Sequence, residues 1–280
     1  MIVLNALKET EEWVAKAKSK GKIIGFVPTM GALHDGHMSL VERAEKENDM
    51  TIVSIFVNPT QFNNPDDLKK YPRTEEADIE LLKKAAVDAV FIPDEKSLYP
   101  NGQQSEHFDF NGIENQMEGK FRPGHFDGVG TIVKKLFEII QPDRVYFGEK
   151  DFQQLRIIQQ MVASLKLPIQ IVPVPIKRES DGLAMSSRNA RLTKEMRKEA
   201  PIIYKILKEA RKYYQNHSVS ETKKWVQHRI EQTGLKLEYF EIADENTLLP
   251  VVRKTPSRAV RGFLAVFAGE IRLIDNIRLN

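Results

Sequence analysis

The 280-residue sequence contains no cysteine, which excludes disulfide bonds, thiolate catalysis and cysteine-ligated zinc. No apolar run approaches the roughly 18 residues that a membrane span requires. The first residues lack the basic stretch followed by a long apolar stretch that marks a secretory signal. There is no Walker A motif and no Gly-x-Gly-x-x-Gly motif, so neither a P-loop kinase nor a dinucleotide-dependent dehydrogenase is favoured. We therefore expect a cytoplasmic protein that does not bind membranes.

The charge is distributed unevenly along the chain. Residues 1–193 hold 25 Lys and Arg against 28 Asp and Glu, whereas residues 194–280 hold 17 against 11. A basic second part could attract a polyanion such as ATP, or it could be a solvated helical surface. Its bases are mixed with acids and no aromatic-rich strand of the RNA-binding kind is present, so we expect no nucleic-acid partner.

The first two thirds of the chain alternate strand-like and helix-like segments. Apolar and β-branched runs predict strands at 22–27, 51–57, 89–92, 144–147 and 169–174. Amphipathic patterns predict helices at 7–20, 36–47, 74–86, 130–140 and 151–165. This alternation predicts an α/β fold, a Rossmann-like parallel sheet with helices on both faces. In such sheets the ligand lies beyond the carboxyl ends of the strands.

The pattern changes after the fifth strand. We expect helices at 194–214 and 220–232, a strand at 237–242, and a hairpin formed by 259–267 and 271–274. These elements predict a smaller α+β domain. With a boundary in the polar stretch near 175–185, the predicted domains are residues 1–177 and 178–280.

The most specific local feature is the turn at 27–37, between a strand and a helix. His34 and His37 are three residues apart, so on a helix they lie on one face. A helix start offers unpaired N–H groups to an anion, and Gly31 and Gly36 let backbone approach a ligand. We interpret the turn as a phosphate site, best suited to ATP. The alternatives are two surface histidines near a cap, or zinc, for which a third ligand is not evident.

Two more loops carry polar residues where strands end. Asn58 and Gln61 follow the strand at 51–57, and their amides suit the hydroxyl and carboxylate of a small polar substrate. By themselves they could form an ordinary Asn-Pro turn. Residues 185–189 combine two serines with Arg188, which suits a triphosphate clamp or, alternatively, a helix cap.

A further loop follows the strand at 144–147. Gly148 permits close approach of a ligand, and Lys150 can pair with a phosphate. Asp151 could cap the next helix or bind a ribose hydroxyl. We expect one of Gln153 and Gln154 to face the ligand cleft.

Taken together, these loops make the chain recognisable as similar to a known family. Five motifs occur in the order typical of the pantothenate synthetase (pantoate–β-alanine ligase) family, within the His-x-x-His nucleotidyltransferase superfamily. They lie at residues 28–37, 56–62, 122–129, 147–154 and 185–189, and the resemblance covers essentially the whole chain.

The resemblance implies a Rossmann-like domain, a small lid domain and a homodimer. It also implies a two-step reaction, in which ATP with Mg²⁺ and pantoate give pantoyl adenylate and pyrophosphate, and β-alanine then displaces AMP. A simple nucleotidyltransferase would share the histidine turn, but its phosphorylated acceptor would require more cations than the amides near Asn58 provide.

The resemblance also implies roles for individual residues. The catalytic set is His37, as proton donor or charge stabiliser, with His34, Lys150 and Arg188. The ATP-binding set is Met30, Gly31, Ala32, Leu33, His34, Asp35, Gly36, His37, Gly148, Glu149, Lys150, Asp151, Lys177, Met185, Ser186, Ser187 and Arg188. The substrate-binding set is Pro28, Met30, Asn58, Gln61, Phe62 and Gln154, with Asn58 placed near β-alanine.

Three positions need separate mention. Lys177 departs from the family pattern, which usually has a small apolar residue against the adenine. Asp78 is a candidate magnesium ligand by its sequence neighbourhood. Arg122 and His125 lie in a loop that could cap the pantoate pocket.

Overall fold

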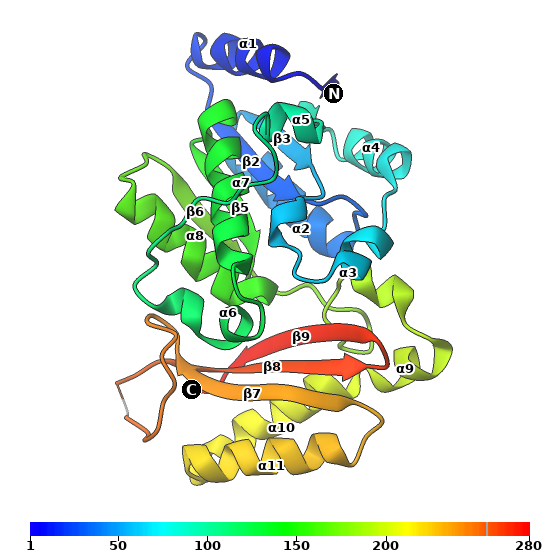
Figure 1. Ribbon diagram of the computed structural model, residues 1–280, viewed down its shortest axis with the longest axis vertical. Helices are drawn as coiled ribbons and strands as arrows, with labels where there is room; N and C mark the ends of the chain where they lie inside the picture. Colours follow the sequence, from blue (N-terminus) through cyan, green and yellow to red (C-terminus); the bar gives the residue numbers. More distant parts are fainter. Residues whose placement is uncertain (256) are drawn as a thin grey trace.

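The computed structural model describes residues 1–255 and 257–280 and contains two separate sheets (Figure 1). The six-stranded sheet consists of β1 (Ile2–Leu4), β2 (Ile24–Thr29), β3 (Met50–Ile55), β4 (Ala89–Phe91), β5 (Arg144–Gly148) and β6 (Gln170–Val174). The helices in this part are α1 (Leu7–Lys18), α2 (Asp35–Glu47), α3 (Pro65–Lys70), α4 (Glu75–Lys84), α5 (Glu95–Leu98), α6 (Met117–Phe121), α7 (His125–Ile140) and α8 (Phe152–Ser164). The second part consists of α9 (Lys194–Glu199), α10 (Ile202–Asn216), α11 (Val219–Glu231), β7 (Lys236–Asp244), β8 (Val260–Ala268) and β9 (Ile271–Arg278). Short 3-10 turns lie at Pro59–Gln61, Ile113–Asn115, Glu149–Asp151 and Ser187–Arg191.

The large sheet is parallel and buried on both faces, which confirms the predicted α/β class. Successive strand residues point to opposite faces. Phe26 and Ile52 pack in the core that includes α1, α7 and α8. Their neighbours Val27 and Val53 pack in the core that includes α2 and α4. This two-sided burial explains why the strands are continuous apolar runs in the sequence.

The strand order β1-β4-β3-β2-β5-β6 reverses direction between β2 and β5. The chain moves outward from β2 through β3 in one direction and from β5 to β6 in the other. Such a switch point leaves a crevice at the carboxyl ends of the two central strands. The histidine turn follows β2 and the Lys150 loop follows β5, so both loops open at this crevice.

The small sheet is antiparallel, in the order β7-β8-β9, and contains the predicted hairpin. Figure 1 shows it between α6 on one side and α10 and α11 on the other. Residues of α10, α11 and the small sheet form one core, yet Phe263 of β8 belongs to the core of the large sheet and contacts Phe152, with ring centroids 5.9 Å apart. The division into domains 1–177 and 178–280 stays a prediction.

Two predicted helices differ clearly from those observed. The single helix at 194–214 is wrong, because the chain forms α9 and α10 with Pro201 between them. Proline has no N–H to donate and clashes with the preceding turn, so it begins α10 instead of continuing α9. Helix α7 starts at His125 and not at residue 130. Gly128 lies inside this helix, and a Cβ there would lie 2.3 Å from the Thr60 carbonyl oxygen, so this close approach requires glycine. The short strand β1 was not predicted.

Among the helices of the described part of the chain, none is both long and apolar enough to span a membrane.

Candidate active site

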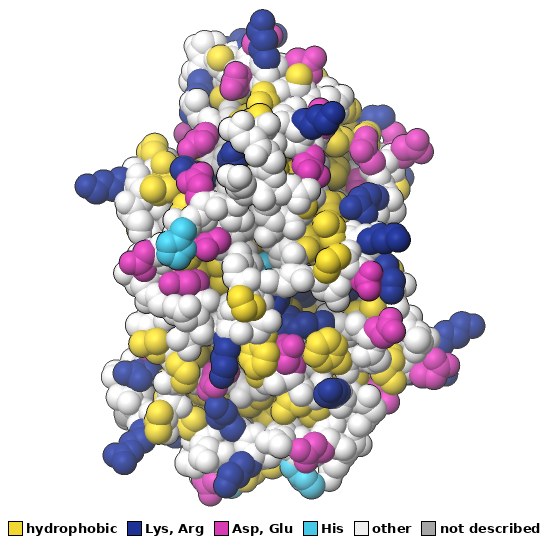
Figure 2. All heavy atoms as spheres, viewed as in Figure 1, with side chains coloured by type: hydrophobic (Ala, Val, Ile, Leu, Met, Phe, Trp, Pro, Cys, Tyr) yellow, Lys and Arg dark blue, Asp and Glu magenta, His cyan; other side chains and the backbone are white. Residues whose placement is uncertain are grey.

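A cavity of about 220 Å³ lies at the carboxyl ends of β2 and β5. It brings together most of the residues predicted for the site: Pro28, Met30, His34, Gly36, His37, Asn58, Gln61, Gly148, Lys150, Asp151, Gln154, Lys177, Met185, Ser186, Ser187 and Arg188. Phe62 lines the two adjoining cavities. The larger of these, about 540 Å³, lies between the two sheets. Figure 2 shows Lys and Arg side chains in the hollow between the upper and lower parts of the molecule.

Five predicted residues line none of these three cavities: Gly31, Ala32, Leu33, Asp35 and Glu149. The first four lie in the turn at 27–37, where backbone rather than side chains is organised. Asp78 of α4 accepts the N–H groups of Ala32 and Leu33, both at 2.8 Å, and its side chain also accepts the Thr74 hydroxyl. Both carboxylate oxygens of this buried residue are therefore committed to the protein. Asp78 shapes the turn, and the magnesium role considered from sequence does not fit it.

The rings of His34 and His37 lie against one another at the start of α2, with centroids 4.1 Å apart and planes inclined by 38°. Nδ1 of His34 accepts the Gly36 N–H at 3.1 Å, and Nδ1 of His37 accepts the His34 N–H at 3.4 Å. A neutral imidazole that accepts at Nδ1 carries its proton on Nε2. Each ring can therefore donate one hydrogen bond from Nε2.

Burial keeps these two rings neutral. Burial lowers the pKa of His37 to about 3, with the neighbouring His34 and the Lys150 ammonium acting in the same direction. Burial, followed by Lys150, also lowers the pKa of His34. Both changes follow from the cost of placing a cation where water is excluded and another cation is close. At neutral pH these two rings are therefore uncharged donors close to the Lys150 ammonium.

The amide of Asn58 is fully used inside the protein, and Asn58 is only 1% exposed. Its Nδ2 donates to the Gly128 carbonyl and to Oε1 of Gln61, at 3.1 and 3.2 Å. Its Oδ1 accepts the Tyr99 and Thr60 hydroxyls. Asn58 therefore fixes the Gln61 side chain here, and its direct contact with β-alanine stays a prediction.

Gln61 is held from several directions. Its backbone carbonyl accepts Nδ1–H of His125 at 2.8 Å and a guanidinium N–H of Arg122 at 3.1 Å. Its Oε1 accepts from Asn58, whereas its Nε2 has, among the described residues, only the weak acceptor Sδ of Met30, at 3.0 Å. The arrangement leaves an amide N–H pair at the cavity that a substrate oxygen can take over.

The loop after β5 separates the roles of two glutamines. Gln153 is buried, and its amide binds the carbonyls of Ile113 and Gln116 and the N–H of Glu118. Gln154 lines the cavity, as one of the pair was expected to do. Asp151 occupies the N-cap position of α8, but no capping hydrogen bond from its side chain occurs within the described residues. Its carboxylate lies 3.4 Å from Nζ of Lys150.

The loop at 186–191 closes the cavity from the other side. The Ser187 hydroxyl donates to the Ala32 carbonyl at 3.1 Å, which joins this loop to the histidine turn. Arg188 and Arg191 both pair with Asp67 of α3, at 2.8 and 2.7 Å. Arg188 is therefore held by an acidic partner at the cavity.

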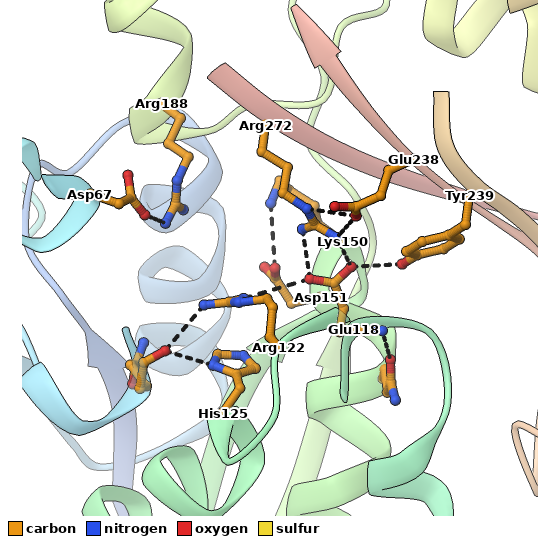
Figure 3. A network of polar contacts seen from close by, with 12 residues as sticks. Asp67, Glu118, Arg122, His125, Lys150, Asp151, Arg188, Glu238, Tyr239 and Arg272 are labelled. Carbon is orange, nitrogen blue, oxygen red and sulfur yellow. Dashed lines mark hydrogen bonds and ion pairs between the residues drawn. The ribbon is translucent and has the colours of Figure 1, made fainter. Parts of the chain in front are cut away.

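A buried charge network that sequence analysis missed joins α6 to the small sheet (Figure 3). Glu118 accepts two hydrogen bonds from Arg272 of β9, at 2.7 and 2.8 Å, and one from the Tyr239 hydroxyl at 2.6 Å. Arg122 lies 3.5 Å from the same carboxylate. Although burial opposes ionisation, the hydrogen bonds and charge of Arg272 lower the pKa of Glu118 to about 2. Arg122 was considered from sequence, but Tyr239 and Arg272 lie 121 and 154 positions from Glu118, so no local pattern marks their contacts.

An apolar wall of the cavity was also missed. Val129, Ile132, Val133 and Leu136 of α7 line it together. Their spacing of three and four residues places them on one helical face. That periodicity is visible in the sequence, but it does not distinguish a cavity wall from ordinary core.

The fold and this cavity define the class: an α/β protein with a polar, partly cationic site at the switch point of its parallel sheet. The sequence matches the Pantoate-beta-alanine ligase family over residues 2–278, and the chain belongs to this family.

Individual relatives agree with this assignment. The chain is 54% identical to the pantothenate synthetase of Christiangramia forsetii, over 95% of each chain. The crystal structure of the pantothenate synthetase of Thermus thermophilus superposes with a TM-score of 0.92 at 40% identity, covering 100% of this chain and 99% of that one. The pantoate-beta-alanine ligase of Francisella tularensis, complexed with beta-gamma ATP and beta-alanine, gives a TM-score of 0.83 at 40% identity, covering 100% and 98%.

Proposed function

We propose that this protein condenses (R)-pantoate with β-alanine at the expense of ATP, giving pantothenate, AMP and pyrophosphate through a pantoyl adenylate. Family membership and the names of the relatives support this function. The observation that carries it is the shared cavity in which His34, His37 and Lys150 lie with the amides of Gln61 and Gln154. Groups that can donate hydrogen bonds to phosphate therefore line the same cavity as amides suited to a small hydroxy acid.

ATP binds with its phosphates at the start of α2 in this proposal. The Nε2–H groups of His34 and His37 donate to phosphate oxygens, and the Lys150 ammonium neutralises charge at the α-phosphorus. Ser186 and Arg188 bind the outer phosphates once Arg188 leaves Asp67. The ribose lies near Gly148 and Asp151. The adenine lies against the 175–177 segment, where the Lys177 carbonyl is fixed by the Met185 N–H at 3.1 Å.

Pantoate has a polar end and a dimethyl group, and the cavity has matching surfaces. Gln61 and Gln154 bind its hydroxyls and carboxylate. The dimethyl group packs against Met30 and the apolar face of α7 defined above, with Pro28 and Phe62 nearby. Burying these methyl groups stabilises the complex by the ordinary hydrophobic effect.

The chemistry proceeds in two displacements. A pantoate carboxylate oxygen attacks the α-phosphorus, and pyrophosphate leaves with the electron pair of the broken P–O bond. The β-alanine amine then attacks the acyl carbon, loses a proton, and AMP leaves. Because the enzyme forms no covalent bond to either substrate, its contribution is to position the substrates and to stabilise developing negative charge with preorganised donors.

Mg²⁺ accompanies ATP in this proposal. Within residues 1–255 and 257–280, no group of three or more His, Asp or Glu side chains could hold a metal ion, and Asp78 is committed to backbone. Because Mg²⁺ commonly binds through substrate phosphates and water, we assign it no protein ligand and no step. The homodimer implied by the resemblance and the cytoplasmic location expected from the sequence stay predictions.

Pyrophosphate release tests the function directly. Enzyme incubated with ATP, Mg²⁺ and pantoate without amine is expected to release pyrophosphate and retain an acyl adenylate, and AMP release is expected to require β-alanine. Lys150→Ala is expected to slow pyrophosphate release by roughly 10²-fold or more, the scale of a lost transition-state contact. Lys166→Ala, a lysine beyond the end of α8 and outside the cavity, is the matched control. Pyrophosphate release without pantoate, or AMP release without the amine, would contradict the proposal.

A further inference from the structure

Two adjacent residues of β9, Asp275 and Asn276, contact two different loops of the active site. Both are buried, with 3% of their surface exposed. Side chains of neighbouring strand residues point to opposite faces. One strand of the small sheet can therefore reach the loop after β5 with one side chain and the segment after β6 with the next.

Asn276 binds the backbone of the Lys150 loop. Its Nδ2 donates to the carbonyls of Glu149 and Lys150, both at 2.9 Å. Its Oδ1 accepts a guanidinium N–H of Arg261 at 2.6 Å. Both N–H donors of the amide are therefore used. One binds the carbonyl of Lys150, and the other binds the carbonyl of the preceding residue, Glu149.

Arg261 fixes the orientation of the Asn276 amide. Its Nε donates to Glu245 at 3.0 Å, and its guanidinium carbon lies 4.0 Å from the ring centroid of Phe152, the first residue of α8. An amide held at its oxygen by a fixed cation can present its N–H groups in only one direction. The contact therefore fixes the peptide bonds on both sides of Lys150 as well as the start of the helix that follows.

Asp275 binds the segment that follows Lys177. Its two oxygens pair with the Arg178 guanidinium at 2.6 and 2.8 Å. Arg178 also stacks on Tyr204, 3.6 Å from the ring centroid, and forms an antiparallel bridge with Ala184. This bridge brings the cavity-lining residues Lys177 and Met185 together at the base of a short hairpin.

We propose that β9 positions both nucleotide-contacting loops: Asn276 sets Lys150 for the attack at phosphorus, and Asp275, through Arg178, sets the 177–185 hairpin for ATP binding. Both line the smaller adjoining cavity. Both are positioning residues in this proposal, because Asn276 acts through the Lys150 loop and Asp275 acts through Arg178. The inference rests on the proposed use of ATP. It predicts different kinetic effects for two neighbouring residues, which a general loss of stability does not produce.

The first test is Asn276→Asp, which keeps the size of the side chain but replaces its N–H donors with an acceptor. The carbonyls of Glu149 and Lys150 then face an oxygen, so the loop must move. We expect single-turnover pyrophosphate release to slow by on the order of 10- to 100-fold, the scale of a small displacement of a catalytic group. The KM for ATP is expected to change by less than about threefold, because the hairpin is untouched.

The second test is Arg178→Lys, which keeps the charge beside Asp275 but not the paired, planar contact. We expect the KM for ATP to rise on the order of tenfold while the single-turnover rate at saturating ATP falls less than about threefold. Asp275→Asn is likewise expected to raise the KM for ATP. If Asn276→Asp does not fold, Asn276→Ser, which retains one donor, is measured in its place and is expected to show an intermediate rate.

Asn48→Asp is the matched control. Asn48 also donates twice from Nδ2, to the Ala44 carbonyl and the Tyr146 hydroxyl, and accepts from an arginine, Arg144. Asn48 lies at the opposite ends of the strands from the cavity. The rates of the Asn48→Asp variant should therefore stay within about twofold of wild type even if this variant unfolds more easily. A folded Asn276→Asp with a wild-type rate, or equal effects of both β9 changes on rate and KM, would overturn the inference. A wild-type enzyme without pyrophosphate release would instead overturn the proposed function.

Discussion

At the scale of single residues, backbone contacts divide the histidines of the cleft into two kinds. His34 and His37 accept backbone N–H groups at Nδ1, whereas the Nδ1 of His125 must donate because its partner is the Gln61 carbonyl. In the neutral state the first two carry a proton on Nε2, and His125 carries a lone pair there. Burial lowers the pKa of His125 to about 3, so it too is neutral at pH 7.

This tautomer assignment gives a prediction for His37. If the residue acts as a neutral donor, His37→Gln keeps an N–H group and should retain adenylate formation within roughly tenfold of wild type. His37→Ala has no donor and should lose roughly 10²-fold or more. The measurement is single-turnover pyrophosphate release at pH 7.5.

Proton transfer from His37 predicts a different outcome. Glutamine cannot supply a proton, so the two variants would then be equally slow. The ATP charge raises the pKa of a nearby imidazole, so this comparison has to be made with ATP bound. His217→Gln, at the distant end of α10, controls for general effects of the substitution.

At the scale of elements, the turn between β2 and α2 depends on a carboxylate from α4. Gly31 has φ +76° and Ala32 has φ +49°, both in the left-handed region. That backbone aims consecutive N–H groups at Asp78. A Cβ on Gly31 would lie 3.0 Å from both Asp78 Oδ2 and Ile55 Cγ2, so the close contact itself requires glycine.

Asp78→Asn tests this role against the magnesium role. One oxygen becomes an NH₂ group, which leaves a backbone N–H of the turn without its acceptor and should displace the histidines. We expect the KM for ATP to rise on the order of tenfold, with no change in the Mg²⁺ concentration needed at saturating ATP.

Asp88→Asn is the control, because Asp88 also accepts a backbone N–H, from Thr51, but at the amino end of β3. A higher Mg²⁺ requirement for the Asp78 variant alone would show that Asp78 contacts the metal.

Local pattern predicted the elements and loops whose signal lies within a few residues. The strands were visible because they are buried on both faces, and the polar loops because each follows a strand. The contacts that hold those loops were not visible. Asn276 reaches Lys150 across 126 positions and Arg272 reaches Glu118 across 154. Nothing in the hairpin sequence distinguishes these residues from other polar strand residues.

At the scale of the whole molecule, buried ionisable groups determine how stability depends on pH. The folded state keeps His37 and His125 neutral down to about pH 3, whereas the unfolded chain protonates histidine near 6.5. Between these values the unfolded state binds more protons. Linkage therefore requires the free energy of unfolding to fall as pH drops below 6.5. Glu118, with its pKa lowered to about 2, causes a second decrease in the free energy of unfolding as pH falls below 4.5.

We therefore expect urea denaturation to show an acid-sensitive protein. Each of the two histidines should lower the free energy of unfolding by about 2 kcal/mol at pH 5 relative to pH 8, because its pKa differs between the folded and unfolded states. His125→Gln removes one titrating group, so the free energy of unfolding should change less with pH between pH 6.5 and 5. The substitution also lowers stability at pH 8, because the packing and the contact of the imidazole with the Gln61 carbonyl are lost. His217→Gln, which leaves His37 and His125 in place, is the control for the substitution itself. A profile of His125→Gln parallel to wild type over that interval would mean that His125 is already protonated in the folded protein and that its contact with the Gln61 carbonyl is made by an imidazolium.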